Sequence, residues 1–220
     1  MFSNKIIGKI FLFVIIINIC LVLLGKLFIP ETNLLGIAGD CLILSIYGIV
    51  GYSVFPKNQD KVLRLAGLFG LICGVIFAAE ILLEYAILPK DNTSWGLIEF
   101  GSVFALYLLA SVISTYKNKS IKCGIITAVE SALISSIMWM LFVFLTFYLF
   151  RGTARQEYVF RIEGNYDDFA HSGMTNFNTF IMEDFLGAGF FHLLIGPIIA
   201  ALLGVIGGAI GKIILRIKHK

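Results

Sequence analysis

Six long apolar runs constrain this chain more than any other feature of its sequence. They cover residues about 6–29, 34–55, 63–88, 96–115, 124–150 and 185–214. Each run is long enough to cross roughly 30 Å of hydrocarbon as a helix, which takes about 20 residues. Backbone polar groups in lipid must be satisfied within the segment, so helices are expected there. The sequence therefore predicts an all-α polytopic membrane protein, a six-transmembrane-helix bundle in a lipid bilayer, with residues 1–220 forming one integral membrane domain.

The composition excludes a soluble domain of this length. Hydrophobic residues make up 59% of the chain and charged residues 14%, and 220 residues cannot bury that much apolar surface in water. The first run follows a short basic leader, but the segment GKLFIPETN after it has no small-x-small cleavage site. We therefore expect an uncleaved signal anchor.

The basic residues predict the orientation, because short cytoplasmic loops are enriched in Lys and Arg. Twelve basic residues fall on one side and five on the other. The first set is Lys5, Lys9, Lys57, Lys61, Arg64, Lys117, Lys119, Lys122, Lys212, Arg216, Lys218 and Lys220, and the second is Lys26, Lys90, Arg151, Arg155 and Arg161. This bias predicts a multi-pass protein of the plasma (inner) membrane with both termini in the cytoplasm. All acidic residues except Asp60 and Glu130 fall on the outer side or in the outer half of a run, an arrangement that would concentrate cations there.

The connection at residues 151–184 is the only long one, and we expect it to form an ordered extracytoplasmic loop or cap. Its aromatic content argues against disorder. Tyr158, Phe160 and Ile162 alternate with their neighbours, which weakly predicts a strand. A stripe formed by Phe177, Phe180, Ile181 and Phe185 predicts a short helix on the membrane surface. The segment would act as a lid; the alternative is an ordered surface loop without a role.

Ionisable residues inside the apolar runs are the best indication of function, because charge in the bilayer centre costs at least about 2.5–3.5 kcal/mol. Asp40, Glu80, Glu84, Glu99 and His192 all lie in the outer half of a run. If their helices are neighbours, the five side chains converge on one outward-facing pocket that binds a metal ion, a small cation, a proton or a cationic solute. Two alternatives remain: a structural hydrogen-bond network, and, for Glu84 and Glu99, contact with lipid headgroups.

The last run carries a ladder of small residues. Gly196, Ala200, Gly204 and Gly208 recur every four positions, a spacing that lets helices pack closely in lipid. A second stripe, formed by Gly67, Gly70, Gly74 and Ala78 in the third run, is the predicted packing partner. The alternative is that these faces dock a membrane subunit or form a homo-oligomer.

No motif identifies an enzyme, a metal or a cofactor. The chain has no HExxH and no GxSxG, and its three histidines are far apart. The lysine clusters are short and explained by topology, so no nucleic-acid partner is expected. The leading hypothesis is a membrane protein that binds or transports a small cation, proton or cationic solute. A non-catalytic subunit or scaffold that docks through glycine-rich helices is the second, and a membrane enzyme with its site under the 151–184 loop is the third.

Overall fold

A computed structural model describes residues 4–54, 60–86 and 93–218, and within these ranges the chain forms helices joined by turns, without a strand. Six helices are long and apolar enough to cross a membrane, so the predicted all-α polytopic bundle is confirmed. They are α1 (Asn4–Phe28), α2 (Leu34–Val54), α3 (Asp60–Ala86), α4 (Thr93–Asn118), α5 (Ile121–Leu149) and α8 (Phe177–Lys218). The connections from α2 to α3 and from α3 to α4 lie outside the described residues.

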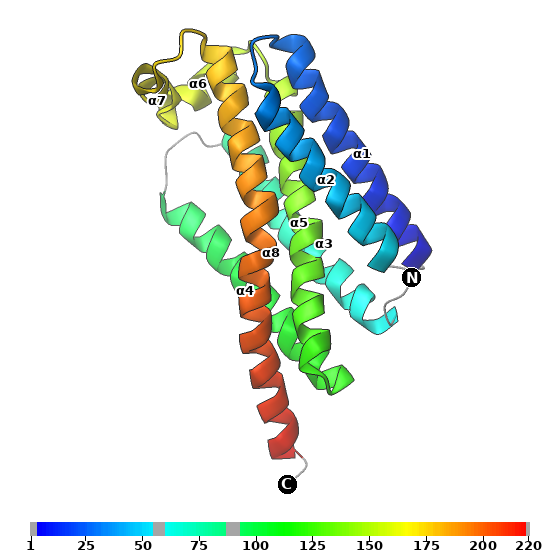
Figure 1. Cartoon of the computed structure of the whole chain (residues 1–220). Coiled ribbons are helices and arrows are strands. Elements are labelled where there is room, and N and C mark those ends of the chain that lie inside the picture. The colour runs from blue at the N-terminus through cyan, green and yellow to red at the C-terminus, as the bar shows by residue number, and fades with distance from the viewer. Residues whose placement is uncertain (1–3, 55–59, 87–92, 219–220) are drawn as a thin grey trace.

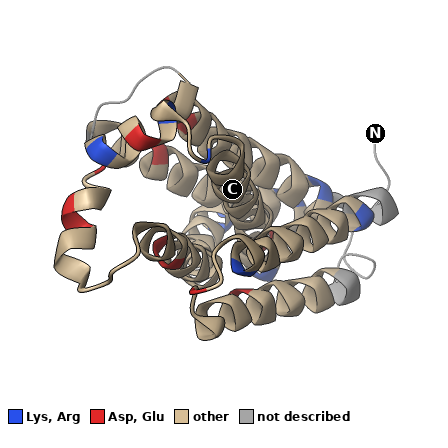
Figure 2. Ribbon diagram, turned by 90° about the horizontal axis from the view of Figure 1, so that it is seen from above, with Lys and Arg blue, Asp and Glu red and all other residues tan. Residues whose placement is uncertain are grey.

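Two short helices, α6 (Ala154–Ile162) and α7 (Asn165–Ser172), follow α5 and lie together at one end of the bundle. We call them the cap helices and this end the cap end. The start of α1 and the end of α8 lie at the opposite end, the terminal end (Figure 1). The cap helices project to one side of the bundle instead of covering its centre, as the view from above shows (Figure 2).

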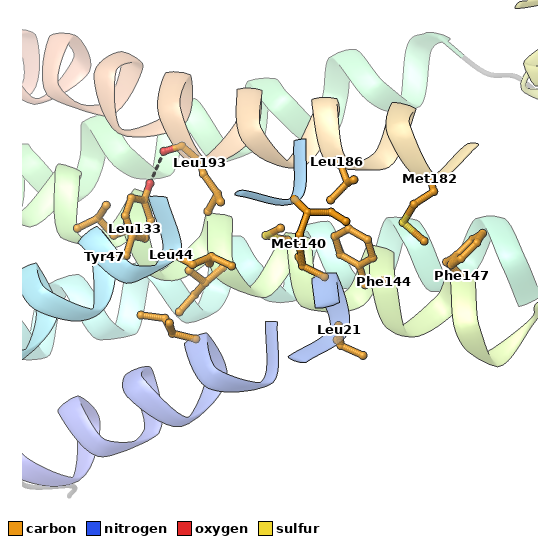
Figure 3. Packing of buried hydrophobic residues seen from close by; sticks show 14 of the residues in the cluster. Leu21, Leu44, Tyr47, Leu133, Met140, Phe144, Phe147, Met182, Leu186 and Leu193 are labelled. Carbon is orange, nitrogen blue, oxygen red and sulfur yellow. Dashed lines mark hydrogen bonds between the residues drawn. The ribbon is translucent and has the colours of Figure 1, made fainter. Parts of the chain in front are cut away.

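Helix α5 is the centre of the bundle and packs against α1, α3, α4 and α8. Its residues from Ser131 to Ile137 are buried without interruption, so it has no lipid-facing stripe over these two turns. Toward the cap end, Met140 and Phe144 are fully buried among apolar side chains of α1, α2 and α8 (Figure 3). A helix that is apolar on all sides is expected to be interior, and α5 is that helix here.

Small residues set the closest approaches between helices. A Cβ added at Gly204 of α8 would lie 3.0 Å from the Ile125 Cα of α5, and one at Gly207 would lie 2.5 Å from the Leu108 carbonyl oxygen of α4. Helix α8 therefore wedges between α4 and α5. The predicted partner, α3, instead packs on α5, where a Cβ at Gly70 would lie 2.8 Å from the Ile134 Cβ.

Buried polar side chains tie neighbouring helices through hydrogen bonds to backbone carbonyls. Such bonds are worth roughly 0.6 kcal/mol on average in membrane proteins. Asn18 Nδ2 of α1 donates to Ile137 O at 3.0 Å, and Tyr47 of α2 donates to Leu193 O of α8 (Figure 3). Further bonds run from Ser111 to Gly204 O at 2.7 Å, from Ser131 to Ala66 O at 3.2 Å and from Tyr148 to Leu21 O at 2.8 Å.

The strand expected around residues 158–163 is wrong, because this segment is helix α6. Gln156, Val159 and Phe160 are its buried residues, a spacing of three and four that suits one face of a helix. The helix is also N-capped, because the Thr153 side chain accepts a hydrogen bond from Gln156 N. Gly164, with φ of 78°, then separates α6 from α7. The apparent alternation was therefore part of a helical face.

The surface helix expected from Phe177 to Phe185 is also corrected. These residues form the first turns of α8, which continues unbroken for 42 residues to Lys218. At 1.5 Å per residue it is about 63 Å long, twice the hydrocarbon thickness, so it extends beyond the bilayer. Phe177, the first residue of α8, packs against both cap helices. Its ring stacks on Tyr166 of α7 at 4.3 Å and meets Phe160 of α6 edge-on at 5.6 Å.

Replacing Gly207 by Ala is expected to destabilise the fold by about 1–3 kcal/mol, because the new methyl group would overpack against backbone. The matched control is Gly101→Ala on α4, where an added Cβ meets nothing within 4 Å. The midpoint of thermal unfolding in detergent should fall for the first variant only. Equal midpoints would mean that α4 and α8 do not pack at this distance.

A cluster of carboxyl groups at the cap end

Three of the five predicted residues come together at the cap end of α3 and α4. Glu80 and Glu84 are one turn apart on α3, and both interact electrostatically with Glu99 near the start of α4. Glu80 and Glu84 are half-buried, whereas Glu99 is only 8% exposed. These side chains therefore form one group and do not point to separate regions of the membrane surface.

A fourth carboxyl group, from Glu163, joins them from the turn between the two cap helices. It lies within hydrogen-bonding reach of the Glu84 carboxyl and also interacts with Glu80. Sequence reasoning placed Glu163 among the loop acids but missed this role, because no spacing relates it to Glu84. The positive φ required at Gly164 marks the turn but does not say which helix the turn reaches. We call Glu80, Glu84, Glu99 and Glu163 the glutamate cluster.

The cluster is short of compensating partners within the described part of the chain. Arg161 forms an ion pair with Glu157 at 2.8 Å, and within the described residues no salt bridge reaches the four glutamates. Arg155 approaches the last turn of α3 but donates to the Tyr85 carbonyl oxygen and not to a carboxylate. The Glu99 Oε1 atom is buried without a hydrogen bond. An unsatisfied buried carboxyl oxygen is costly and requires an explanation.

His192 of α8 lies beside the cluster on its terminal side. Its imidazole stacks on Trp139 of α5 at 4.3 Å and meets the Phe77 ring of α3 edge-on at 5.0 Å. Phe77 precedes Glu80 by three residues on α3, and Phe100, 6.2 Å from the imidazole, directly follows Glu99 on α4. A layer of four rings thus separates the glutamate cluster from the middle of the bundle.

Asp40, the fifth predicted residue, lies elsewhere. It is fully buried, and its Oδ2 lies 3.5 Å from where a Cβ would stand at Gly189 of α8, near Met140. Within the described residues, no electrostatic interaction joins Asp40 to the four glutamates. The physical reason is the position of α2, which packs on α1 and α8 and not on α3 or α4. The structure therefore divides the five residues between two places.

The ladder of small residues on α8 is largely covered by the same chain. Ala200, Gly204 and Gly208 are buried, and Gly196 faces the Ser136 hydroxyl of α5, to which an added Cβ would come within 3.0 Å. This stripe offers little free surface to another subunit, so the scaffold hypothesis gains no support from it.

A metal centre is not prearranged in the described residues: no three His, Cys, Asp or Glu side chains there converge on a point that could hold an ion. The cluster is thus a group of carboxyls without the ligand geometry that a small divalent ion needs. No protein family, curated protein or solved structure matches this chain.

Carboxyl groups close together in a medium of low dielectric constant cannot all be ionised without a cation. The cluster can therefore do two things: hold one or more protons, or attract a positively charged solute. The adjoining aromatic rings add weak attraction for a cation, because the face of an aromatic ring is electronegative.

Replacing Glu163 by Gln should stabilise the protein at pH 8 by about 0.2–1 kcal/mol, because it removes one of several repelling charges. Glu157→Gln, on the preceding helix α6, is the matched control and should have no effect or lower the stability, since it breaks the pair with Arg161. Thermal unfolding in low-salt detergent solution measures both. A lower midpoint for E163Q than for wild type would show that the four carboxyls do not repel one another.

Proposed function

We propose that this multi-pass membrane protein binds a proton or a small cationic solute at the glutamate cluster. The single observation that carries the proposal is Glu99, nine-tenths buried, with an unpartnered carboxyl oxygen and with Glu80 and Glu84 as its charged neighbours. A bound cation would supply the partner that the Glu99 carboxyl oxygen lacks. When no cation is bound, protons would neutralise the carboxyl groups of the cluster. A purely structural network would be expected to satisfy its own hydrogen bonds.

The kind of cation follows from the shape of the site. Because the described residues prearrange no three-ligand centre, a tightly ligated divalent metal is disfavoured. A proton needs only one carboxyl oxygen. A hydrated monovalent ion or a small organic ammonium ion needs several separated acceptors and gains from ring faces such as Phe100, which is 43% exposed.

The cap helices have a part in this proposal, because Glu163 contributes from the turn between them. Glu163 is the exposed member of the cluster, so it would attract a cationic solute toward Glu84. Following the distribution of basic residues, the cap end faces the extracytoplasmic side and the terminal end faces the cytoplasm. The solute would then be drawn from outside the cell.

A row of buried hydroxyl groups favours passage toward the terminal end over binding alone. It follows α4 and α5 away from the ring layer. Tyr107 and Ser135 share a hydrogen bond of 2.5 Å, and further along Thr127 donates to Ser114 at 2.7 Å. Ser111, between these pairs, is also fully buried. Hydroxyl groups both donate and accept, so such a row suits a proton better than a metal ion.

Trp139 offers a direct measurement of binding, since it touches His192 beside the cluster. The chain has two tryptophans, so Trp95→Phe leaves Trp139 as the sole reporter. Protons, sodium or methylammonium added to this variant in nanodiscs should change the Trp139 fluorescence saturably. Glu80→Gln and Glu99→Gln should each weaken the apparent affinity at least tenfold, because each removes a charge that the bound cation needs.

Glu157→Gln in the same background is the control, because Glu157 is exposed and paired with Arg161. It should titrate as the parent does. If no cation of the three gives a saturable change, or if E80Q and E99Q titrate like the parent, the cluster is not a cation site.

A further inference from the structure

Basic side chains gather at the terminal end of the bundle, where the turn between α4 and α5 meets the last turns of α8. Two contacts join these segments, which are far apart in the sequence. Lys212 Nζ donates to the Lys119 carbonyl oxygen at 3.3 Å, and Lys218 Nζ donates to the Tyr116 hydroxyl at 2.8 Å. We call the six basic residues of this region the terminal basic patch: Lys117, Lys119, Lys122, Lys212, Arg216 and Lys218.

No acidic residue compensates the charge of this patch. The sequence has no Asp or Glu at residues 100–129 or 185–218, and in the part of the chain that the structure describes none of the six basic side chains forms a salt bridge. Five of them are exposed, and Lys212 is half-buried. The orientation rule explains why they share one side of the membrane, but it does not require two distant segments to meet. Like charges held together repel, and a bound anion would offset that repulsion.

Exposed isoleucines lie in the same turns as the basic residues. On α8, Ile213 directly follows Lys212 and Ile217 directly follows Arg216, and these isoleucines are 56% and 70% exposed. Ile121, the first residue of α5, is also exposed. The last turns of α8 extend past the α4–α5 turn (Figure 1), so part of this surface has no helix beside it. Cations next to exposed apolar side chains suit a molecule that joins an anionic headgroup to hydrocarbon chains.

We propose that the terminal basic patch binds an anionic phospholipid, with the phosphate among the ammonium and guanidinium groups and the acyl chains along the isoleucines of α5 and α8. Lys and Arg can reach a headgroup while their hydrocarbon stems stay on apolar surface. With the orientation predicted from the basic residues, the patch lies at the cytoplasmic leaflet, where anionic lipids attract basic clusters next to membrane helices. The site is independent of the glutamate cluster, which lies at the cap end.

The chemistry of the patch disfavours two related molecules. A phosphatidylcholine with the same acyl chains would bring a quaternary ammonium group to a surface that is already cationic. Glycerol 1-phosphate carries the negative charge but has no acyl chain, so it gains nothing from the isoleucines. These two molecules therefore separate the contribution of net charge from that of the hydrocarbon chains.

Native mass spectrometry of the full chain in a non-ionic detergent measures the binding. The probes are phosphatidylglycerol, phosphatidylcholine with the same acyl chains, and glycerol 1-phosphate. We expect saturable binding of phosphatidylglycerol and at least tenfold weaker binding of the other two. Added salt should weaken the binding of phosphatidylglycerol, because exposed charges are screened.

Three substitutions test the patch itself: Lys117→Gln, Lys122→Gln and Arg216→Gln. Among the described residues these side chains make no hydrogen bond or ion pair, so the fold should tolerate the changes. Each should weaken the binding of phosphatidylglycerol about fivefold and the triple variant about a hundredfold, since a basic residue near an anionic lipid surface contributes roughly that factor. Lys9→Gln, exposed on α1 at the same end, is the control and should bind as wild type does.

The thermal unfolding midpoint without lipid shows whether each variant is folded. Equal binding of phosphatidylglycerol and phosphatidylcholine would overturn the inference, and so would equal binding of glycerol 1-phosphate, which would indicate a site for a soluble anion. Undiminished binding to the folded triple variant, or an equal loss in K9Q and the single patch variants, would show that the lipid does not bind at this patch.

Discussion

The close approach of α3, α4 and α8 to the central helix α5 is the interaction on which the rest of the structure depends. In lipid, apolar surface gains nothing by being buried against another helix, so association relies on tight van der Waals packing and interhelical hydrogen bonds. Glycines at Gly70, Gly124 and Gly204 bring the backbones of neighbouring helices close at these crossings. Hydroxyl groups on α4 and α5 then reach carbonyls on the next helix.

This packing explains why the acidic residues divide into two groups. With α5 at the centre, α3 and α4 pack on each other and on α5, whereas α2 packs on α1 and α8. Side chains at a similar depth therefore meet different helices instead of sharing a pocket. The glutamate cluster includes Glu163 from the turn between the cap helices, whereas Asp40 is buried between α2 and α8.

The cap helices link the exposed cap end of the protein to the buried carboxyl groups. Phe177, at the start of α8, packs against aromatic rings of both cap helices. Glu163, in the turn between these helices, lies within hydrogen-bonding reach of Glu84.

The sequence by itself determined the number of membrane-length helices, because run length and hydropathy are local properties that lipid enforces on every segment. It also singled out Glu80, Glu84, Glu99, His192 and Asp40, since charge among apolar residues is visible without a fold. The local pattern wrongly predicted a strand at residues 158–163, because one face of a short helix resembled the alternation of a strand. Only the tertiary structure decided that α3 packs on α5 and not on α8, that Glu163 joins the cluster and that Asp40 does not. Those outcomes depend on which helix faces which across the bundle, and small residues permit close packing without specifying the partner.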